Sequence, residues 1–482
     1  MPLLPLFLVV VYGLCLLFIV CFSLGQWQLT RLALRAYAGP PALPPPAPAA
    51  WPRVTVQLPL YNEQNVVERI IDATAALDYP AGLLHIQVLD DSNDATVGLA
   101  AARVVHHTAQ GLRISHVRRL NREGYKAGAL RHGLTETDGE FIAIFDADFV
   151  PEPDFLRRTV PYFLQDAAVG VVQTRWGHLN QHESLLTRLQ AFGLDAHFLI
   201  EQVGRTFAGF FINFNGTGGI WRRTCIDDAG GWHIDTLTED LDLSYRAQLR
   251  GWRFIYRPEI VAPAELPAVM DALKSQQFRW TKGAAETARK HLGTMWRSSQ
   301  PLATKLQASF HLLNSSVYVV IMLMALLSVP LVFVREDYRE FKFVFQLASV
   351  FLVGFAPLIY YYYTAWRLAQ GKSRLYPGFF LLFLSVSMGL ALHNARAVIL
   401  GWMGQRTPFV RTPKAGSSGR TKRRYRTGGV GFLVLLEGLL AVYFAFGLGC
   451  GIYFGDAGLL PFHTLLTFGF AAVCYYSVRH AR

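Results

Sequence analysis

Apolar runs of strand length alternate with helix-like stretches in the first part of this chain, up to residue 176. Continuous apolar strands separated by helices are typical of a mainly parallel sheet that is covered on both faces. The pattern therefore predicts an α/β domain with a doubly wound sheet, to which we assign residues 53–265. The clearest strand-like runs are residues 54–59, 86–89, 141–145 and 169–173.

A long apolar segment precedes this domain. Residues 3–24 are almost continuously apolar, which is about the length needed to cross a bilayer. They lack a basic start and are long for the apolar core of a signal peptide. We therefore expect an uncleaved transmembrane anchor over residues 1–27. The proline-rich stretch at 40–52 favours an extended spacer, and we assign a linker to residues 28–52.

The sequence after the domain is mostly apolar. Residues 266–300 are expected to form interfacial helices, and residues 301–482 form a transmembrane region. This region contains five segments of membrane length, which are residues 307–334, 344–366, 378–400, 430–454 and 457–478. A helical membrane domain is therefore expected beside the α/β domain, with the lipid bilayer as its partner.

Charge placement decides which segments cross. The basic loop at 403–428 belongs in the cytoplasm by the positive-inside rule. We expect the α/β domain on the same side, so an even number of crossings must separate the two. Segment 378–400 carries His393, Asn394 and Arg396 and is predicted to be interfacial or re-entrant. Five spans then remain, in a protein of the cell (inner) membrane whose α/β domain is cytoplasmic.

Composition excludes some functions. The chain has 482 residues, 52% of them hydrophobic, which is enough for two or three domains. Its net charge of +12 is concentrated between membrane-length segments, so we interpret it as a topology signal and expect no nucleic-acid partner. Five scattered cysteines predict neither a disulfide framework nor a zinc site.

Acidic residues follow two of the predicted strands. Asp90 and Asp91 end one run, and Asp146 and Asp148 follow another. Open α/β sheets bind ligands at the carboxyl ends of their strands. A carboxylate pair one residue apart suits a divalent cation, which can in turn hold a diphosphate. An ordinary turn at residues 90–94 is the alternative for the first pair.

Two later motifs add candidate chemistry. Thr238 precedes Glu239 and Asp240, and this triplet fits a capped helix start. Either acid could also act as a base toward an attacking hydroxyl, and the sequence does not choose between them.

Gln276, Arg279 and Trp280 are spaced to share one helical face. Arg279 could bind phosphate oxygens and Trp280 a sugar ring, although an amphipathic helix resting on the membrane also fits. Asn215 and Gly216 lie in a glycine-rich turn that allows close backbone approach to a ligand.

With these motifs in this order, the chain resembles the membrane-integrated family 2 glycosyltransferases, the processive inverting enzymes that include cellulose synthase. The sequence is most similar to that of the plant cellulose-synthase-like mannan and glucan synthases, in particular at residues 87–92, 124–130 and 214–217. The resemblance implies a fold of the GT-A type with Mg²⁺ or Mn²⁺ as cofactor. It also implies that the metal binds to Asp146 and Asp148, and that Asp240, with Glu239 beside it, is the catalytic base.

The same resemblance implies roles for further residues. The nucleotide would be held by Asp90, Asp91, Lys126, Tyr61 and Glu63. The acceptor and pyrophosphate would be bound by Gln276, Arg279, Trp280, Asn215 and Gly216. A gating loop that closes over the nucleotide would include Phe409, Thr412 and Lys414, although Arg411 stands where the family pattern has valine.

The expected activity is processive, inverting β-glycosyl transfer from UDP-glucose or GDP-mannose to a polysaccharide that is exported through the membrane. Accessory export subunits are compatible partners. A non-processive enzyme that glycosylates a membrane lipid is the first alternative, and an inactive scaffold or export partner is the second. Polar and aromatic residues along the spans, including Asn314, Ser315 and Tyr318, are compatible with a polymer channel.

Overall fold

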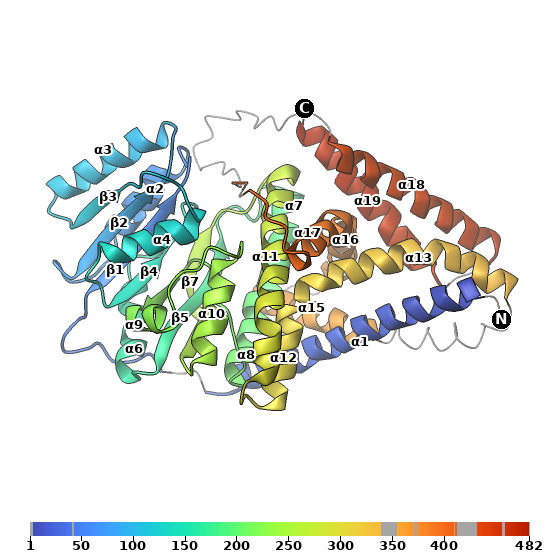
Figure 1. Cartoon of the computed structure of the whole chain (residues 1–482), viewed down its shortest axis with the longest axis horizontal. Coiled ribbons are helices and arrows are strands. Elements are labelled where there is room, and N and C mark those ends of the chain that lie inside the picture. The colour runs from blue at the N-terminus through green and yellow to red at the C-terminus, as the bar shows by residue number, and fades with distance from the viewer. Residues whose placement is uncertain are drawn as a thin grey trace.

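The computed structural model describes residues 3–40, 43–338, 354–370, 374–408, 410–411, 431–455 and 458–481. The α/β domain lies at one end of the molecule, and the apolar helices α1, α13, α18 and α19 lie at the other (Figure 1). Between them runs α11 (Met270–Arg297). This arrangement confirms the predicted α/β domain with a helical domain beside it.

One mixed sheet forms the centre of the α/β domain. Its strands are β1 (Val54–Leu60), β2 (Leu84–Asp90), β3 (Ile114–Val117), β4 (Phe141–Ile144), β5 (Val169–His178), β6 (Gly219–Arg222) and β7 (Arg253–Ala264). They are arranged in the order β3-β2-β1-β4-β6-β5-β7. Only β6 is antiparallel to its neighbours among the described strands. From β1 the chain runs outward to β2 and β3 and then returns to β4 on the other side of β1. Such a switch point opens a crevice at the strand ends.

Helices cover both faces of the sheet (Figure 1). Those of the domain are α2 (Val67–Ala75), α3 (Thr96–Ala109), α4 (Tyr125–Thr135), α5 (Phe155–Thr159), α6 (Pro161–Gln165), α7 (Leu185–Ala196), α8 (Gln202–Phe207), α9 (Arg223–Asp228) and α10 (Glu239–Leu249). A π-helical turn, η1 (His197–Glu201), joins α7 to α8.

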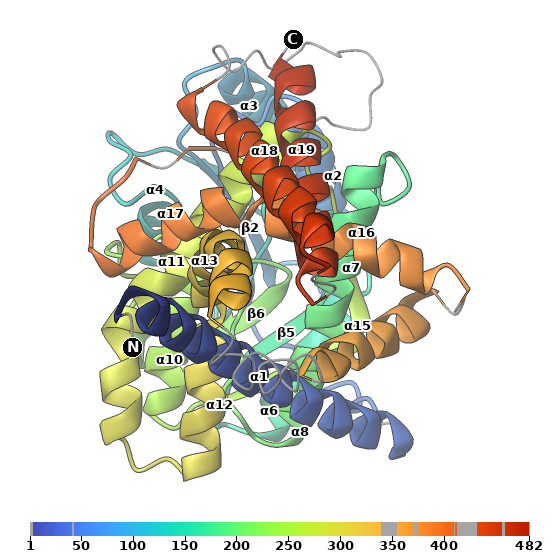
Figure 2. The same cartoon turned by 90° about the vertical axis from the view of Figure 1, so that its right-hand side faces the viewer.

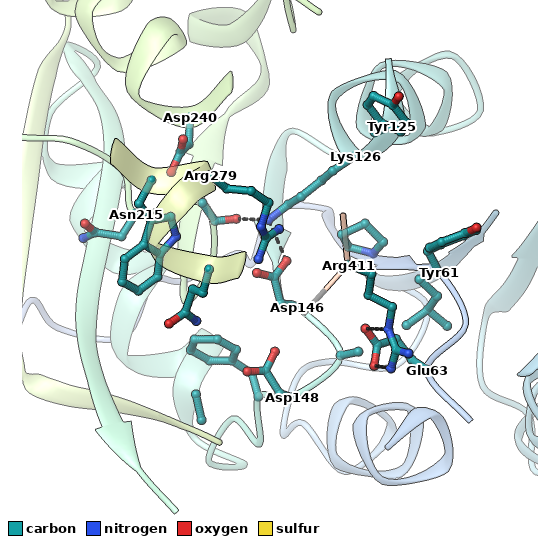
Figure 3. A pocket seen from close by; sticks show the side chains of 18 of the residues that line it. Tyr61, Glu63, Tyr125, Lys126, Asp146, Asp148, Asn215, Asp240, Arg279 and Arg411 are labelled. Atoms are coloured by element: carbon teal, nitrogen blue, oxygen red, sulfur yellow. Dashed lines mark hydrogen bonds and ion pairs between the residues drawn. The ribbon is translucent and has the colours of Figure 1, made fainter. Parts of the chain in front are cut away.

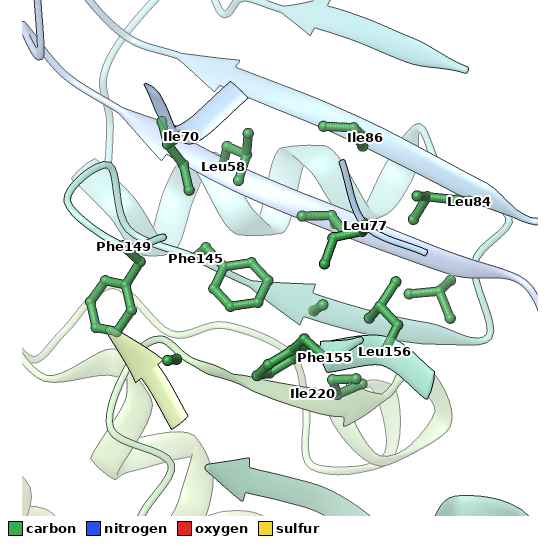
Figure 4. Close-up of a cluster of buried hydrophobic side chains, with 14 of the residues drawn as sticks. Leu58, Ile70, Leu77, Leu84, Ile86, Phe145, Phe149, Phe155, Leu156 and Ile220 are labelled. Carbon is green, nitrogen blue, oxygen red and sulfur yellow. The ribbon is translucent and has the colours of Figure 1, made fainter. Parts of the chain in front are cut away.

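Alternate side chains of the central strand β4 enter different cores. In β4, Phe141 and Ala143 belong to the cluster on one face, of which Figure 4 shows Leu58 and Phe145, whereas Ile142 and Ile144 pack on the other face. Burial of a large apolar side chain contributes roughly 1.5–3 kcal/mol. The two-sided core therefore fixes the register of the strands, and with it the position of the polar residues at their ends.

The remaining helices are α1 (Leu3–Ala38), α12 (Leu302–Leu312), α13 (Val317–Asp337), α15 (Phe355–Gln370), α16 (Tyr376–Gly389), α17 (Ala391–Trp402), α18 (Phe432–Tyr453) and α19 (Leu460–Ala481), with a 3₁₀ turn η2 (Asn314–Ser316) before α13. Three segments of the described residues are long and apolar enough to cross a membrane: Leu3–Ala38, Asn314–Asp337 and Phe432–Tyr453. These segments indicate a membrane protein.

The pair α16 and α17 meets the same criteria together but is bent by 50° between the two helices. Such a bend belongs to a broken span or a re-entrant loop, so the interfacial or re-entrant character of residues 378–400 stays a prediction. Part of the expected span at 344–366 falls outside the described residues, as does most of the loop at 403–428.

One predicted boundary is wrong. Residues 28–38 belong to α1 and not to a linker, because the helix continues to Ala38. Leu29 and Ala33 are fully buried, and a side chain at Gly204 of α8 would collide with the backbone of Leu29. Packing of α1 against the α/β domain therefore extends the helix, and the proline-rich stretch begins only after it.

The C-terminal helices hold the beginning of α11. Lys274 of α11 donates hydrogen bonds to both carboxylate oxygens of Glu437 in α18, at 2.7 and 2.8 Å, and to Ser477 in α19 at 2.8 Å. The Met270 amide donates to His480 Nδ1 at 3.0 Å. Figure 2 shows α18 and α19 side by side, so both contacts join α11 to one helical hairpin. Because the ion pair is buried, removing either partner would leave an uncompensated charge.

Candidate active site

A cavity of about 190 Å³ opens at the carboxyl ends of the central strands (Figure 3). Its walls come from β1, β5 and β7, from the loops after β2 and β4, and from the helices α4, α10 and α11, which are far apart in the sequence. Most of the predicted site residues line it: Tyr61, Glu63, Asp91, Lys126, Asp146, Asp148, Asn215, Gly216, Glu239, Asp240, Gln276, Arg279 and Trp280. The fold thus brings together nearly all the candidates from the sequence.

The loop after β4 carries two carboxylates into this cavity. Phe145 and Phe149 on either side of it are 0% and 2% exposed, so the loop is anchored at both ends and the acids are held at the sheet edge. Asp146 accepts a hydrogen bond from Lys126 Nζ at 2.6 Å, and Asp148 is nearly buried. Hard carboxylate oxygens at such an edge fit Mg²⁺ or Mn²⁺.

Lys126 links three parts of the site. It stands at the start of α4, after Gly124 and Tyr125, which both have positive φ. Its ammonium also donates to the Gly216 carbonyl at 2.9 Å. Burial opposes its charge, but the nearby carboxylates of Asp146 and Glu239 outweigh burial and raise the pKa of Lys126. The lysine is therefore a fixed cation at the bottom of the cavity.

Asp240 lies on the first turn of α10 and faces the same cation. Burial and the neighbouring charge of Glu239 raise the pKa of Asp240 to about 7. A side chain at Gly216 would stand 3.0 Å from Asp240 Oδ2, so glycine allows the turn to approach the carboxylate closely. A carboxylate with this pKa suits a base that works near neutral pH.

The side-chain cap that the sequence suggests for α10 at Thr238 does not form. Thr238 makes no side-chain cap to α10, and its hydroxyl lies 3.2 Å from that of Thr287 in α11. A side chain at Gly283 would collide with the backbone nitrogen of Thr238. The close contact between the two helices therefore takes the hydroxyl away from the helix start and fixes α11 against the Glu239–Asp240 turn.

Helix α11 presents Gln276, Arg279 and Trp280 to the cavity, as their spacing predicts. The Arg279 guanidinium stands among the acids of the site: burial opposes its charge and lowers its pKa, while Asp146 and Glu239 counteract that effect. The Trp280 ring lies 6.3 Å from that of Trp176. The helix thus supplies a cation and an aromatic surface opposite the carboxylates.

The two acids after β2 have different environments. Asp91 lines the cavity and pairs with Arg119. Asp90 is 1% exposed and accepts hydrogen bonds from His116 and the Ser92 amide, each at 2.9 Å. Burial opposes ionisation, but these bonds hold the pKa of Asp90 below its ordinary value. Asp90 is not among the described residues that line the cavity, so its contact with a nucleotide stays a prediction, and its hydrogen bonds shape the loop after β2.

Two arginines of the cavity were not predicted as ligands. Arg411 donates to both carboxylate oxygens of Glu63 at 2.9 and 2.6 Å (Figure 3), and Arg122 lies 3.2 Å above the centre of the Tyr61 ring. Arg411 could have been suspected, because it replaces valine in the gating pattern. Nothing in the sequence singles out Arg122. The gating-loop residues Phe409, Thr412 and Lys414 lie outside the described residues.

A second cavity, of about 440 Å³, adjoins the first and extends between α1, α13, α15 and α16. Both cavities are lined by Trp176, Asn215, Asp240 and Trp280. The polar and aromatic residues that reach it from the apolar helices include Asn314, Ser315, Tyr318, Tyr361 and Tyr362. Asp240, the carboxyl with the raised pKa, therefore lies where the two cavities meet.

Known proteins are similar to this chain in sequence and in fold. A family profile described as "Glycosyltransferase like family 2" matches residues 52–283. Glucomannan 4-beta-mannosyltransferase 7 of Arabidopsis thaliana is 36% identical over 421 residues, which cover 84% of this chain and 72% of the relative. Probable glucomannan 4-beta-mannosyltransferase 2 of Oryza sativa subsp. japonica is 42% identical over 308 residues, which cover 62% and 53%. The chain thus spans about half the length of the second relative.

Among solved structures, a mannosyltransferase from Pyrobaculum calidifontis in complex with GDP-Man and Mn²⁺ has a TM-score of 0.54 and 20% identity. The match covers 82% of this chain and 100% of that chain. At this identity the likeness concerns the fold, and it confirms the expected GT-A type.

Proposed function

Because the chain belongs to the family 2 glycosyltransferases, we propose that it transfers mannose from GDP-mannose to the growing end of a β-1,4-linked mannan or glucomannan. The polymer class comes from the names of the curated relatives. The observation that carries the proposal is the position of Asp240 at the junction of two cavities. A donor in the smaller cavity and an acceptor in the larger one would meet at this carboxylate.

The reaction would be one displacement at the anomeric carbon. The acceptor hydroxyl oxygen forms a bond to that carbon from the face opposite the diphosphate, and the bond from the carbon to the β-phosphate oxygen breaks. Asp240 takes the hydroxyl proton, and the nucleoside diphosphate leaves with the bonding electrons. The raised pKa of Asp240, about 7 because of burial and the charge of Glu239, supports its role as the base.

Further residues would bind the leaving group. Asp146 and Asp148 would hold Mg²⁺ or Mn²⁺, which supplies positive charge to the departing diphosphate. Lys126, on the floor of the donor cavity, would keep Asp146 oriented, and Arg279 would bind phosphate oxygens from the opposite wall. Tyr61, Glu63 and Asp91 line the far end of the same cavity, where the nucleoside would lie.

We also propose that the product is a polymer that leaves through the larger cavity. That cavity continues into the apolar helices, and aromatic side chains offer flat surfaces to successive sugar rings. The protein would lie in the cell (inner) membrane with its α/β domain in the cytoplasm, where nucleotide sugars are available. A glycolipid product would need the donor cavity but no such continuation.

The test uses the full chain in lipid nanodiscs with Mn²⁺ and radiolabelled GDP-mannose or UDP-glucose. Products are separated into insoluble polymer, soluble oligosaccharide and organic-phase lipid. The proposal expects labelled polymer from GDP-mannose, no product with EDTA, and a rate about 10²–10⁴ lower from Asp240→Asn. Label from UDP-glucose alone would refute the donor, and label only in the organic phase would refute the polymer.

A further inference from the structure

A polar pair on the wall of the larger cavity has no part in the reaction described above. His197 and Glu201 are the first and last residues of the π-helical turn η1, and both line that cavity. Single π-turns inside α-helices are rare and occur frequently at functional sites. This one carries two ionisable side chains to a cavity that Asp240 also lines.

Glu201 is a buried, ionised anchor. It is 8% exposed and accepts hydrogen bonds from His197 Nδ1 and from Gln26 of α1, each at 2.8 Å. The Tyr361 phenol is a third partner, from α15. Burial opposes ionisation, but the hydrogen bond and charge of His197 and the charge of Arg205 hold the pKa of Glu201 down at about 2. The imidazole ring is thereby fixed in orientation.

The other nitrogen of His197 faces Asn215. Its Nε2 lies 3.1 Å from Asn215 Oδ1, and that oxygen also accepts a hydrogen bond from Asn213 Nδ2 at 2.7 Å. A contact between Nε2 and a carbonyl oxygen requires a proton on Nε2. The imidazole thus bridges Glu201 and Asn215 and sets the rotation of the Asn215 amide.

In this orientation of the Asn215 amide, one hydrogen-bond donor, its NH₂ group, is not used. Asn215 Nδ2 is buried and has no hydrogen-bond partner among the described residues. The residue lies where the two cavities meet and directly precedes Gly216, which is in close contact with Asp240. A buried amide NH₂ without a partner costs about 1–3 kcal/mol, and a sugar hydroxyl beside Asp240 would satisfy it.

We propose that His197, held by Glu201, is a positioning residue for the transfer reaction, and that it turns the Asn215 amide so that its NH₂ donates to the acceptor sugar beside Asp240. The inference rests on the proposed function, because its ligand is the carbohydrate acceptor of that reaction. It gives α1 a further role, since Gln26 of that helix helps to hold Glu201.

Two substitutions separate positioning from mere structural support. In His197→Asn the side-chain NH₂ can take the place of Nδ1 and keep the contact with Glu201, but it does not reach Asn215. In His197→Gln the NH₂ can take the place of Nε2 and keep the contact with Asn215. The proposal therefore expects Gln, and not Asn, to preserve acceptor binding.

The experiment measures initial rates of the full chain in nanodiscs with GDP-mannose held at saturation and mannohexaose varied. His197→Asn and His197→Ala should raise the KM for mannohexaose about tenfold, as expected for the loss of one well-oriented hydrogen bond. The Kd for GDP should stay within about twofold in both. His197→Gln should stay within about threefold of the wild type. His107→Ala is the matched control, because His107 forms a similar, partly buried 2.8 Å pair with Asp72, and neither residue lines either cavity.

The outcomes are distinct. Wild-type rates with Asn and weak binding with Gln would show that only the Glu201 contact matters and would overturn the proposal, as would an unchanged KM in all three variants. An equal loss of GDP binding would overturn it as well. If the wild type transfers no mannose, the proposed function fails. Direct titration of mannohexaose onto the wild type and the Asn and Gln variants then decides the inference on its own: the same ranking supports it, and no binding or equal binding overturns it.

Discussion

Replacing Asp240 with asparagine should stop transfer and at the same time stabilise the fold. The ionised form of this carboxyl is disfavoured in the folded protein, because burial and the charge of Glu239 raise its pKa from 3.8 to about 7. One pKa unit corresponds to 1.36 kcal/mol, so a rise of about three units costs the folded protein about 4 kcal/mol of stability when the carboxyl is ionised. Asparagine has nearly the same shape and carries no charge.

The size of this effect depends on pH. Below the unfolded pKa of 3.8 the carboxyl is protonated in both states, and the stability associated with its raised pKa is fully present. Between that value and about 7 the unfolded state ionises first, so the stability of the wild type falls as pH rises. Above about 7 both states are ionised and the cost stays constant. The advantage of the variant should therefore grow from pH 4 to pH 7 and then level off.

Asp242 provides a matched control on the same helix. It is fully buried and contacts Arg246, Lys290 and His291 at 2.7–2.8 Å. Burial opposes ionisation, but these partners hold the pKa of Asp242 far below its ordinary value. The stability it contributes is present above the unfolded pKa and is lost as pH falls. Asp242→Asn should therefore destabilise the protein, by about 3–5 kcal/mol.

The assay follows thermal unfolding of the detergent-solubilised chain by tryptophan fluorescence at several pH values, with mannosyl transfer measured on the same samples. Asp240→Asn should lose about 10²–10⁴ in rate, the usual contribution of a general base. A variant no more stable than the wild type at pH 8 would refute the electrostatic reasoning. Activity near that of the wild type would refute the assignment of the base.

Three further changes test other parts of the structure. Asp148→Asn should raise the Mn²⁺ concentration needed for half-maximal transfer at least about tenfold, because one hard ligand is lost; an unchanged metal titration would exclude Asp148 as a ligand. Lys274→Met should destabilise the chain by about 3–5 kcal/mol, because it leaves the buried carboxylate of Glu437 unpaired. Adding Glu437→Gln should recover part of this loss, because it replaces that carboxylate by a neutral amide. Thermal unfolding in nanodiscs measures both variants, and additive effects would contradict the coupling. Gly283→Ala should reduce transfer without lowering GDP affinity, because the new methyl group collides with Thr238; normal kinetics would show that the contact relaxes freely.

The sequence could predict those parts of the site that depend on local spacing. Asp146 and Asp148 follow a buried strand within four residues, and Gln276 and Arg279 share one turn of a helix, so their positions follow from the period of the chain alone. Such patterns predicted most of the cavity wall, and they predicted the α/β domain for the same reason.

Contacts between distant segments could not be predicted in this way. Arg411 pairs with Glu63 across 348 residues of sequence, and no pattern in either segment requires the other. The hydroxyl of Thr238 looked like a helix cap, but tertiary packing against α11 redirects it. Asn215 was predicted as a site residue, but its contact with His197 was not, because that geometry depends on the π-turn.

The buried bond between Lys274 and Glu437 has a consequence for biogenesis. A ribosome completes the strands that carry Asp91 and Asp146 long before it reaches residue 437, whereas α11 is joined to the α18–α19 hairpin through Lys274. The catalytic domain can thus reach its fold while its last wall, with Arg279, still lacks support. Nascent chains stalled before α18 should accordingly contain a folded sheet but no competent enzyme, so that sugar transfer begins only once the membrane domain is assembled.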